Sequence, residues 1–492
     1  MIRVAKRLLI AALLLCNNAL AMAPPNVVYI LADDQGYGEA RSFNPKLAIA
    51  TPGIDRLANE GIRFSDAHSS AANCTPTRYG LLTGRYSWRT RLQTGVVEAP
   101  TDPLIQEDVL TVQGFLKGHG YQTAVIGKWH LGWSYETEAG NKMPKSARSD
   151  RAWPVGSRVI GGPVARGFDS FRGYHNGTEI KTWVERDRVV DNLLRFEEML
   201  PRIQDASVSY LEDRGEQKDG PFFLYVALSS PHAPTAPSVE WQGKSGLSPY
   251  VDFVMQTDGV VLRILDALDE TGLAADTLVF FSSDNGTRRG IPMAELRSRG
   301  YDPTYGFRGQ KSDVWEGGHR VPFVARWPGG IQPGSTSHAT IVHNNFISTM
   351  ADILGVQLPD TAGVDSFSIL PILRGKAGCE SAHPHVIHHS TKGCFAIRQS
   401  RWKLVACGGS GGYSEGDEGQ SAQLYDLEAD PYEQVNLIQT EPQRAASLAD
   451  LLELVVANGR STPGRPLAND VPVDIWKTET GRPSVLSDPN AD

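Results

Sequence analysis

Four short apolar runs along the chain have the length and the β-branched content of strands that are buried on both faces of a sheet. Helical patterns lie between them, including residues 53–61 and residues 251–271, where apolar residues recur at helical spacing. Strands that alternate with helices predict an α/β fold with a large, mainly parallel mixed sheet between helices. The four predicted strands are NVVYILA at 26–32, YQTAVIG at 121–127, FFLYVALS at 222–229 and TLVFFSS at 277–283.

The pattern changes near residue 375. CFAIRQ, WKLVAC and AQLYDLE are strand-like, and residues 441–457 follow with a helical pattern. We therefore expect a large domain over residues 24–375 and a smaller C-terminal α+β subdomain over residues 376–492, with an antiparallel sheet. The Gly- and Ser-rich stretch CGGSGGYSEGDEGQS at 407–421 is typical of a mobile loop.

The first residues have the composition of an export signal. Arg3, Lys6 and Arg7 precede the apolar run LLIAALLL, and small residues follow at 19–21. The apolar run is too short to cross a membrane. We therefore expect residues 1–23 to be a signal peptide, and the mature protein to be periplasmic or secreted without a transmembrane segment.

Charge and cysteines narrow the function classes. The formal net charge is −8, which argues against a nucleic acid partner, so an anionic substrate would need a local cationic cluster. Three cysteines lie close together in the sequence, at positions 379, 394 and 407. They predict one disulfide and one remaining thiol, but the sequence does not say which two of them pair. Cys16 falls in the predicted signal, and Cys74 stands alone.

Polar residues follow each predicted strand at its carboxyl end. In open α/β sheets the ligand site lies beyond these ends, so we expect the four clusters to converge there. Any one of them alone could be an ordinary loop. The clusters are Asp33 with Asp34, Lys128 with His130, His232, and Asp284 with Asn285.

The acidic clusters are suited to a hard metal ion. Asp33, Asp34, Asp284 and Asn285 offer side-chain oxygens, which favour Ca²⁺ or Mg²⁺ over zinc. The alternative for either pair is a turn or a helix cap.

The basic residues are suited to an oxyanion and to proton transfer. Arg78, Lys128 and Lys311 are candidate anion ligands, although lone lysines are commonly solvated surface cations. His130 and His232 are candidate general acids or bases, although either could be a packing histidine.

Cys74 opens the motif CTPTRYGLLTG. Pro76 suits the first turn of a helix, which places the cysteine at a helix N-terminus, where a nucleophilic group is favoured. A thiolate nucleophile is one interpretation, but soft sulfur does not match a hard, oxygen-lined metal site.

CTPTRYGLLTGRY resembles the CxPxR modification motif of the formylglycine-dependent sulfatases of the alkaline phosphatase superfamily. Further blocks similar to that family occur in order: NVVYILADDQGYG, GKWHLG, SSPHAP, SSDNG, RGQKSDVWEGGHRVPF, WKLV and LYDLEADPYEQVNL. The resemblance implies hydrolysis of a sulfate ester, on a sulfated saccharide, by a domain over residues 24–375. It also implies that a formylglycine-generating enzyme oxidises Cys74 to formylglycine.

The same resemblance implies a role for each site residue. Asp33, Asp34, Asp284, Asn285 and the modified Cys74 would bind one Ca²⁺ ion. Arg78 would stabilise the formylglycine, and Lys128 and Lys311 would hold the sulfate. His232 would protonate the leaving oxygen, and His130 would take the proton of the second hydroxyl of the aldehyde hydrate.

Some positions depart from the family pattern or are not assigned by it. Glu39, Thr77 and Gln310 differ from the residues expected there, although none is a core ligand. Candidates for the substrate pocket are Tyr174, His175, His319 and the run HPHVIHHS at 383–390. The histidine run could hold a second metal ion, but its irregular spacing favours strand and loop packing.

Two other functions remain open. A phosphodiesterase or phosphonate monoester hydrolase of the same superfamily can also use CxPxR. A non-catalytic protein that binds a sulfated glycan would leave Cys74 unmodified.

Overall fold

The computed structural model describes residues 23–136, 140, 153–176, 181–192, 195–376, 383–477 and 481–486. Cys379 and all of the predicted signal peptide except residue 23 lie outside these ranges. Within them, no helix has the length and apolar character needed to cross a membrane.

A ten-stranded sheet forms the centre of the molecule, in the order β13-β2-β12-β11-β1-β10-β4-β7-β8-β9. Its middle consists of the four predicted strands, which run parallel. Antiparallel pairs join β11 to β12, β12 to β2, β7 to β8 and β8 to β9, so the sheet is mixed, as predicted. The middle strands are β1 (Asn26–Asp33), β4 (Gln122–Lys128), β10 (Phe222–Pro231) and β11 (Thr277–Ser283).

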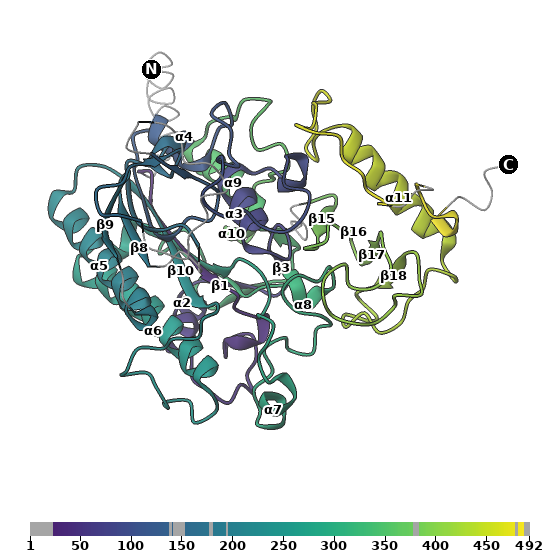
Figure 1. The fold of residues 1–492 in the computed structure, drawn as a ribbon, viewed down its shortest axis with the longest axis horizontal. Coiled ribbons are helices and arrows are strands. Elements are labelled where there is room, and N and C mark those ends of the chain that lie inside the picture. The colour runs from purple at the N-terminus through teal and green to yellow at the C-terminus, as the bar shows by residue number, and fades with distance from the viewer. Residues whose placement is uncertain are drawn as a thin grey trace, which may run out of the picture.

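Helices cover both faces of this sheet (Figure 1). Tyr29 and Leu31 of β1 belong to one core cluster, and the alternate residues Val28 and Ile30 belong to the other. Burial on both faces explains why the central strands are continuous apolar runs. The first cluster includes α3 (Cys74–Thr83), α4 (Val112–Gly118) and α9 (Phe346–Leu354), and the second includes α2 (Pro52–Glu60), α5 (Met199–Gln217) and α6 (Pro249–Glu270).

The C-terminal part carries a separate antiparallel sheet, as predicted. Its four strands are β15 (Val386–His389), β16 (Phe395–Gln399), β17 (Trp402–Val405) and β18 (Gln423–Asp426), and α11 (Pro442–Ala457) packs on it. Figure 1 shows α11 and this sheet beside the large sheet. Cys394 and Cys407 form a disulfide, while Cys74 is a buried free thiol.

The remaining elements are short. Two further two-stranded sheets pair β14 with β3 and β5 with β6. The other strands are β2 (Ile62–Phe64), β3 (Ala67–His68), β5 (Ser134–Tyr135), β6 (Val159–Ile160), β7 (Ser170–Tyr174), β8 (Thr182–Glu185), β9 (Arg188–Asn192), β12 (Phe323–Arg326), β13 (Ser335–Ser337) and β14 (Ile341–Val342), and the other α-helices are α7 (Met293–Ser298), α8 (Glu316–His319) and α10 (Leu370–Leu373). The 3₁₀ turns are Tyr37–Glu39, Ser87–Arg89, Val164–Arg166, Phe196–Glu198, Ala274–Asp276, His343–Asn345 and Ser484–Leu486.

Candidate active site

The carboxyl ends of the four central strands bring the predicted polar clusters together. Asp33 ends β1 and Lys128 ends β4, while His232 and Asp284 directly follow β10 and β11. The backbone N–H of Asp34 donates to Asp284 Oδ1 over 3.2 Å. Because parallel strands end at one edge of the sheet, residues 250 positions apart in the chain become neighbours.

Buried oxygens at this edge form a set of possible metal ligands. One ligand atom each from Asp33, Cys74 and Asp284 lies within 4.8 Å of the others. Asn285 Nδ2 donates to Asp34 Oδ1 over 2.8 Å. Asp33 Oδ1 and Asn285 Oδ1 are buried and have no hydrogen-bond partner among the described residues. Buried oxygens of this kind need a partner, and carboxylate and amide oxygens suit Ca²⁺.

Each carboxylate of the site has its own cation. Arg78 donates to Asp284 Oδ2 through Nη2 over 2.7 Å and through Nε over 3.0 Å. The other pairs are Lys128 Nζ with Asp33 Oδ2 at 2.7 Å and Lys311 Nζ with Asp34 Oδ2 at 2.8 Å. Sequence analysis predicted such a local cationic cluster for an anionic substrate of an acidic chain.

Burial and these charges set the pKa values. Burial acts to raise the pKa of Asp33 and of Asp34, but Lys128 and Lys311 respectively hold each pKa below its ordinary value. Burial and the neighbouring Asp33 raise the pKa of Asp284. The buried charges of the site are therefore balanced. Asp284, whose pKa is raised, is the carboxyl whose charged form a further cation would stabilise most.

Cys74 is the first residue of α3, and Pro76 lies in its first turn, as the motif predicted. The side chain is buried, and burial raises the pKa of the thiol although Lys128 and Lys311 act in the opposite direction. A protonated, enclosed thiol is a poor nucleophile. The unmodified thiol is therefore poorly suited to act as a nucleophile at this position.

The two candidate histidines differ in access. His232 Nε2 lies 3.8 Å from Asp34 Oδ2, and its side chain is 22% exposed, so the ring can meet a substrate. His130 is buried, and neither of its ring nitrogens has a hydrogen-bond partner among the described residues. Burial and Lys128 hold the pKa of His130 well below its ordinary value, which favours the neutral form of this ring.

Three residues that are not glycine have left-handed backbone conformations around the site. The φ angles are 72° at Asp34, 58° at His130 and 88° at Ser312, which follows Lys311. Such conformations cost free energy and persist where the surrounding structure fixes them. Two backbone hydrogen bonds hold Ser312 in this conformation. Its N–H donates to Ala72 O, and its carbonyl accepts from the Thr391 N–H.

The departures from the family pattern have local partners. Glu39 accepts hydrogen bonds from Gly36 N–H at 2.6 Å, from Tyr250 at 3.0 Å and from Tyr301 at 2.8 Å. Burial raises the pKa of Glu39 to about 7. Sequence analysis missed both tyrosines, because no local pattern links them to residue 39.

Thr77 and Gln310 differ in what their side chains do. Thr77 Oγ1 donates to Ala71 O over 2.9 Å, so this side chain stabilises the turn before α3. At position 310 the backbone N–H donates to Asp313 Oδ2 over 2.9 Å, a bond that does not depend on the glutamine side chain.

Two of the pocket candidates are interior residues. Tyr174 and His175 are fully buried, and His175 Nε2 accepts from the Gly132 N–H over 3.2 Å. His175 O also accepts from the His130 N–H over 2.7 Å. His175 therefore supports the loop that carries His130.

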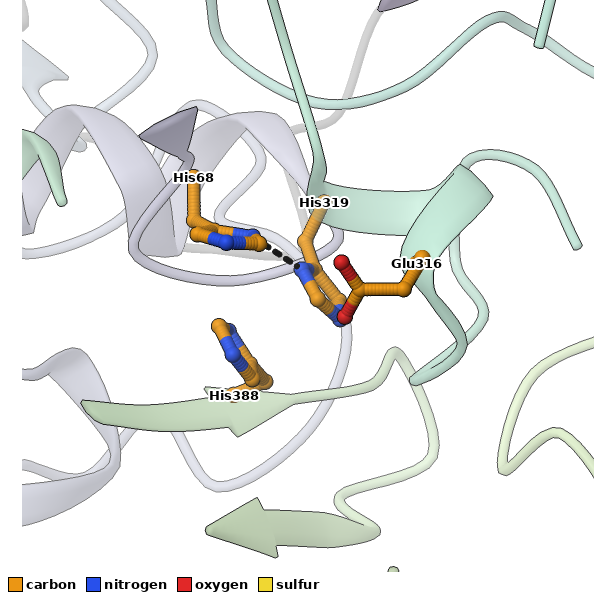
Figure 2. Close-up of side chains that lie close together, drawn as sticks. All are labelled: His68, Glu316, His319 and His388. Carbon is orange, nitrogen blue, oxygen red and sulfur yellow. Dashed lines mark hydrogen bonds and ion pairs between the residues drawn. The ribbon is translucent and has the colours of Figure 1, made fainter. Parts of the chain in front are cut away.

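A second cluster lies where β3, α8 and β15 meet, and it consists of His68, Glu316, His319 and His388 (Figure 2). One ligand atom from each lies within 4.8 Å of the others, and all four side chains are buried. His68 Nδ1 and His319 Nδ1 are hydrogen-bonded over 3.0 Å, one ring donating and the other accepting. His388 lies on β15, consistent with the strand packing favoured for the histidine run.

The arrangement of this cluster is that of a packing network. The rings of His319 and His388 are stacked at 3.7 Å and 8°, so their in-plane lone pairs do not converge on one point. Lys403 Nζ lies 3.0 Å from Glu316 Oε1 and 3.1 Å from His319 Nε2. The lysine already supplies a cation, so the cluster fastens the C-terminal sheet, through β15 and β17, to α8 and β3.

Nearly the whole chain is similar in sequence to known proteins. A family model described as Sulfatase matches residues 25–356, and one described as N-sulphoglucosamine sulphohydrolase, C-terminal, matches residues 306–457. An N-acetylgalactosamine-6-O-sulfatase of Bacteroides thetaiotaomicron is 29% identical, over 89% of this chain and 94% of the relative. Arylsulfatase A of Bos taurus is 31% identical, over 80% of this chain and 76% of the relative.

A solved structure has the same overall fold. It comes from work on the metabolism of multiple glycosaminoglycans by Bacteroides thetaiotaomicron, and it is 27% identical with a TM-score of 0.77. The match covers 88% of this chain and 99% of the other.

Proposed function

The chain belongs to the sulfatase family and is a sulfuric ester hydrolase, and we propose that it hydrolyses sulfate esters of a saccharide with a formylglycine made from Cys74 at a Ca²⁺ site. The observation that supports this most strongly is that Cys74, three carboxylates and three cationic side chains lie close together at one edge of the sheet. The N-acetylgalactosamine-6-O-sulfatase relative is named for a sulfated sugar and the solved structure comes from work on glycosaminoglycans, which supports a saccharide substrate.

The proposed metal ligands are Asp33, Asp34, Asp284, Asn285 and the modified residue 74. The partnerless oxygens Asp33 Oδ1 and Asn285 Oδ1 support this set. When bound, the ion would supply positive charge next to the sulfate, and the hydrated formylglycine would supply an oxygen nucleophile. The three cations already balance the three carboxylates, so a divalent ion would leave the site net positive.

The other side chains would bind the sulfate and move protons. Lys128 and Lys311 would each contact sulfate oxygens, and Arg78 would hold residue 74. His232, which is partly exposed, would donate a proton to the leaving alcohol oxygen as the S–O bond breaks. His130, which is neutral and buried, would accept a proton at residue 74 so that sulfate is released. Overall one water is consumed, and an alcohol, sulfate and a proton are formed.

Export is part of the proposal. The composition of residues 1–23 supports a signal peptide, and the Cys394–Cys407 disulfide is typical of an oxidising compartment. A formylglycine-generating enzyme would then be a partner during biosynthesis.

Parallel assays test the proposal against its nearest rival. An aryl sulfate and an aryl phosphodiester with the same leaving group would be compared by kcat/KM on one preparation. We expect faster sulfate hydrolysis. A faster phosphodiester reaction would favour a phosphodiesterase, and no turnover together with an unmodified Cys74 would favour a glycan-binding protein.

A further inference from the structure

Three side chains without a role in the proposed reaction form a charged surface cluster: Arg289, Lys392 and Tyr413. The guanidinium carbon of Arg289 lies 3.9 Å from the centroid of the Tyr413 ring, and Lys392 Nζ lies 5.1 Å from it. All three are exposed, Tyr413 by 51%. An aromatic face attracts cations, so the ring holds both side chains on one patch of surface.

The segments that carry this cluster pack against the stretch that begins with Lys311, the proposed sulfate ligand. The three segments are each hydrogen-bonded to residues 311–313. The bonds run from Lys311 N to Thr287 O at 2.9 Å, from Thr391 N to Ser312 O at 3.0 Å and from Tyr413 N to Asp313 Oδ1 at 2.9 Å. Arg289 follows Thr287 by two residues, and Lys392 follows Thr391 directly.

The Gly-rich loop over residues 407–421 is tied down where it carries Tyr413. Gly412 packs so closely that a Cβ there would lie 2.4 Å from Asp313 Oδ1, which explains the glycine. Gly411 O accepts from the Lys392 N–H over 3.1 Å, and the Cys394–Cys407 disulfide closes the start of the loop. The cluster is therefore preorganised, which lowers the entropic cost of binding.

The charge of the cluster is not neutralised within the described residues. Neither Arg289 nor Lys392 forms an ion pair with a carboxylate there. Two neighbouring unpaired cations on a chain with a net charge of −8 are suited to an anionic ligand. Arginine offers a planar fork and lysine a point charge, and carboxylates and sulfates bind both.

We propose that Arg289 and Lys392, positioned by Tyr413, bind a second anionic group of the saccharide, a sulfate or carboxylate near the scissile ester. This inference rests on the proposed function and narrows its substrates to polyanionic saccharides. On a chain with a net charge of −8, this local positive charge would determine specificity for such a group.

The test compares hexosamine sulfates that carry one sulfate, two sulfates, or one sulfate and a neighbouring uronate. The wild-type protein should have higher kcat/KM for both dianionic forms. In the double variant Arg289→Ala/Lys392→Ala this preference should fall by about tenfold or more, through KM and not kcat. Arg289→Lys should retain part of it, because the charge remains. A preference for only one dianionic form would identify sulfate or carboxylate as the group bound.

Arg444→Ala is a matched control. The guanidinium carbon of Arg444 lies 4.4 Å from the Trp402 ring, and Trp402 precedes Lys403, whose side chain reaches Glu316. Adjacent strand residues point to opposite faces, so this arginine lies away from the cluster. Its loss should leave the preference unchanged.

Two results would overturn the inference. An active enzyme with no preference for dianionic substrates, or a double variant that keeps the preference, would contradict this inference alone. A wild-type protein that hydrolyses no sulfate ester would overturn the proposed function and this inference with it.

Discussion

Lys128, the last residue of β4, donates a 2.7 Å hydrogen bond to Asp33, the last residue of β1, across the end of β10, which lies between these strands. Both side chains are almost completely excluded from solvent. Lys128 therefore stabilises the charged form of Asp33, a proposed metal ligand. The same lysine would also bind sulfate.

Loss of this lysine should affect stability as well as activity. Lys128→Ala leaves a buried carboxylate without its cation, which should lower the free energy of unfolding by about 3 kcal/mol. Added Ca²⁺ should restore part of that loss, because it would neutralise Asp33. Urea denaturation with and without Ca²⁺ measures both effects. Equal stability of the variant and the wild type without Ca²⁺ would contradict the role of the pair.

Cys74→Ser should lower sulfatase activity by about a thousandfold or more, because serine has no thiol for the proposed oxidation to formylglycine. Mass spectrometry of the peptide that contains residue 74 should show an aldehyde or its hydrate in the natively produced wild type. Thr75→Ser is a control within the motif that keeps both the cysteine and a hydroxyl. A Cys74→Ser protein as active as the wild type would exclude the formylglycine mechanism.

Removal of Ca²⁺ should abolish turnover and lower the melting temperature. The carboxylates of Asp33, Asp34 and Asp284 would then lack the divalent charge that offsets their repulsion of sulfate, and the amide oxygen of Asn285 would lack its ion. The test is chelation followed by titration with Ca²⁺, with metal content measured at each step. Asn285→Ala should need more Ca²⁺ for half recovery, whereas full activity in metal-free protein would refute the assignment.

The sequence predicted the parts of the fold that rest on local pattern. The four central strands are buried on both faces, so each is a continuous apolar run, and the polar residues at their ends converge because the strands are parallel. The two-residue strand Ala67–His68 has no such pattern, since its pairing with Ile341–Val342 depends on a contact far along the chain.

Contacts between residues far apart in the chain also limited the prediction of the candidate sites. Asp34 and Asp284 could be identified because strand ends and a family motif mark them. The network of Lys403 with Glu316 and His319 joins residues 84 and 87 positions apart, and no spacing rule indicates it. The cluster of Arg289, Lys392 and Tyr413 is likewise assembled by the fold from three separate loops.

A buried carboxyl on α6 should make stability depend on pH. Asp258 accepts from the N–H groups of Gly53 and Ile54 at the start of α2, and burial raises its pKa from 3.8 to about 7. Between those values the folded protein binds more protons than the unfolded chain, so this group's contribution to the free energy of unfolding falls as pH rises from about 4 to about 7. The difference corresponds to at most about 4 kcal/mol.

Chemical denaturation at pH 5 and pH 8 tests this effect. Asp258→Asn should reduce the difference between the two pH values, because asparagine does not titrate. Asp266→Asn, at an exposed position on the same helix, should leave the difference as in the wild type. An unchanged difference in Asp258→Asn would rule out this carboxyl as its source.

The roles of His232 and Lys311 can be separated by varying the leaving group. If His232 protonates the leaving oxygen, His232→Ala should slow sulfates of sugar alcohols by about a hundredfold or more, and activated aryl sulfates far less, because a nitrophenolate leaves without a proton. Lys311→Ala should slow both classes by similar factors, since its ammonium would contact sulfate oxygens that all substrates share. The measurement is kcat/KM for a series of sulfate esters ordered by leaving-group pKa, with both variants and the wild type. The slope of log kcat/KM against that pKa should become steeper in His232→Ala and stay unchanged in Lys311→Ala. An equal loss along the whole series in His232→Ala would show that His232 holds the sulfate instead of protonating the leaving oxygen.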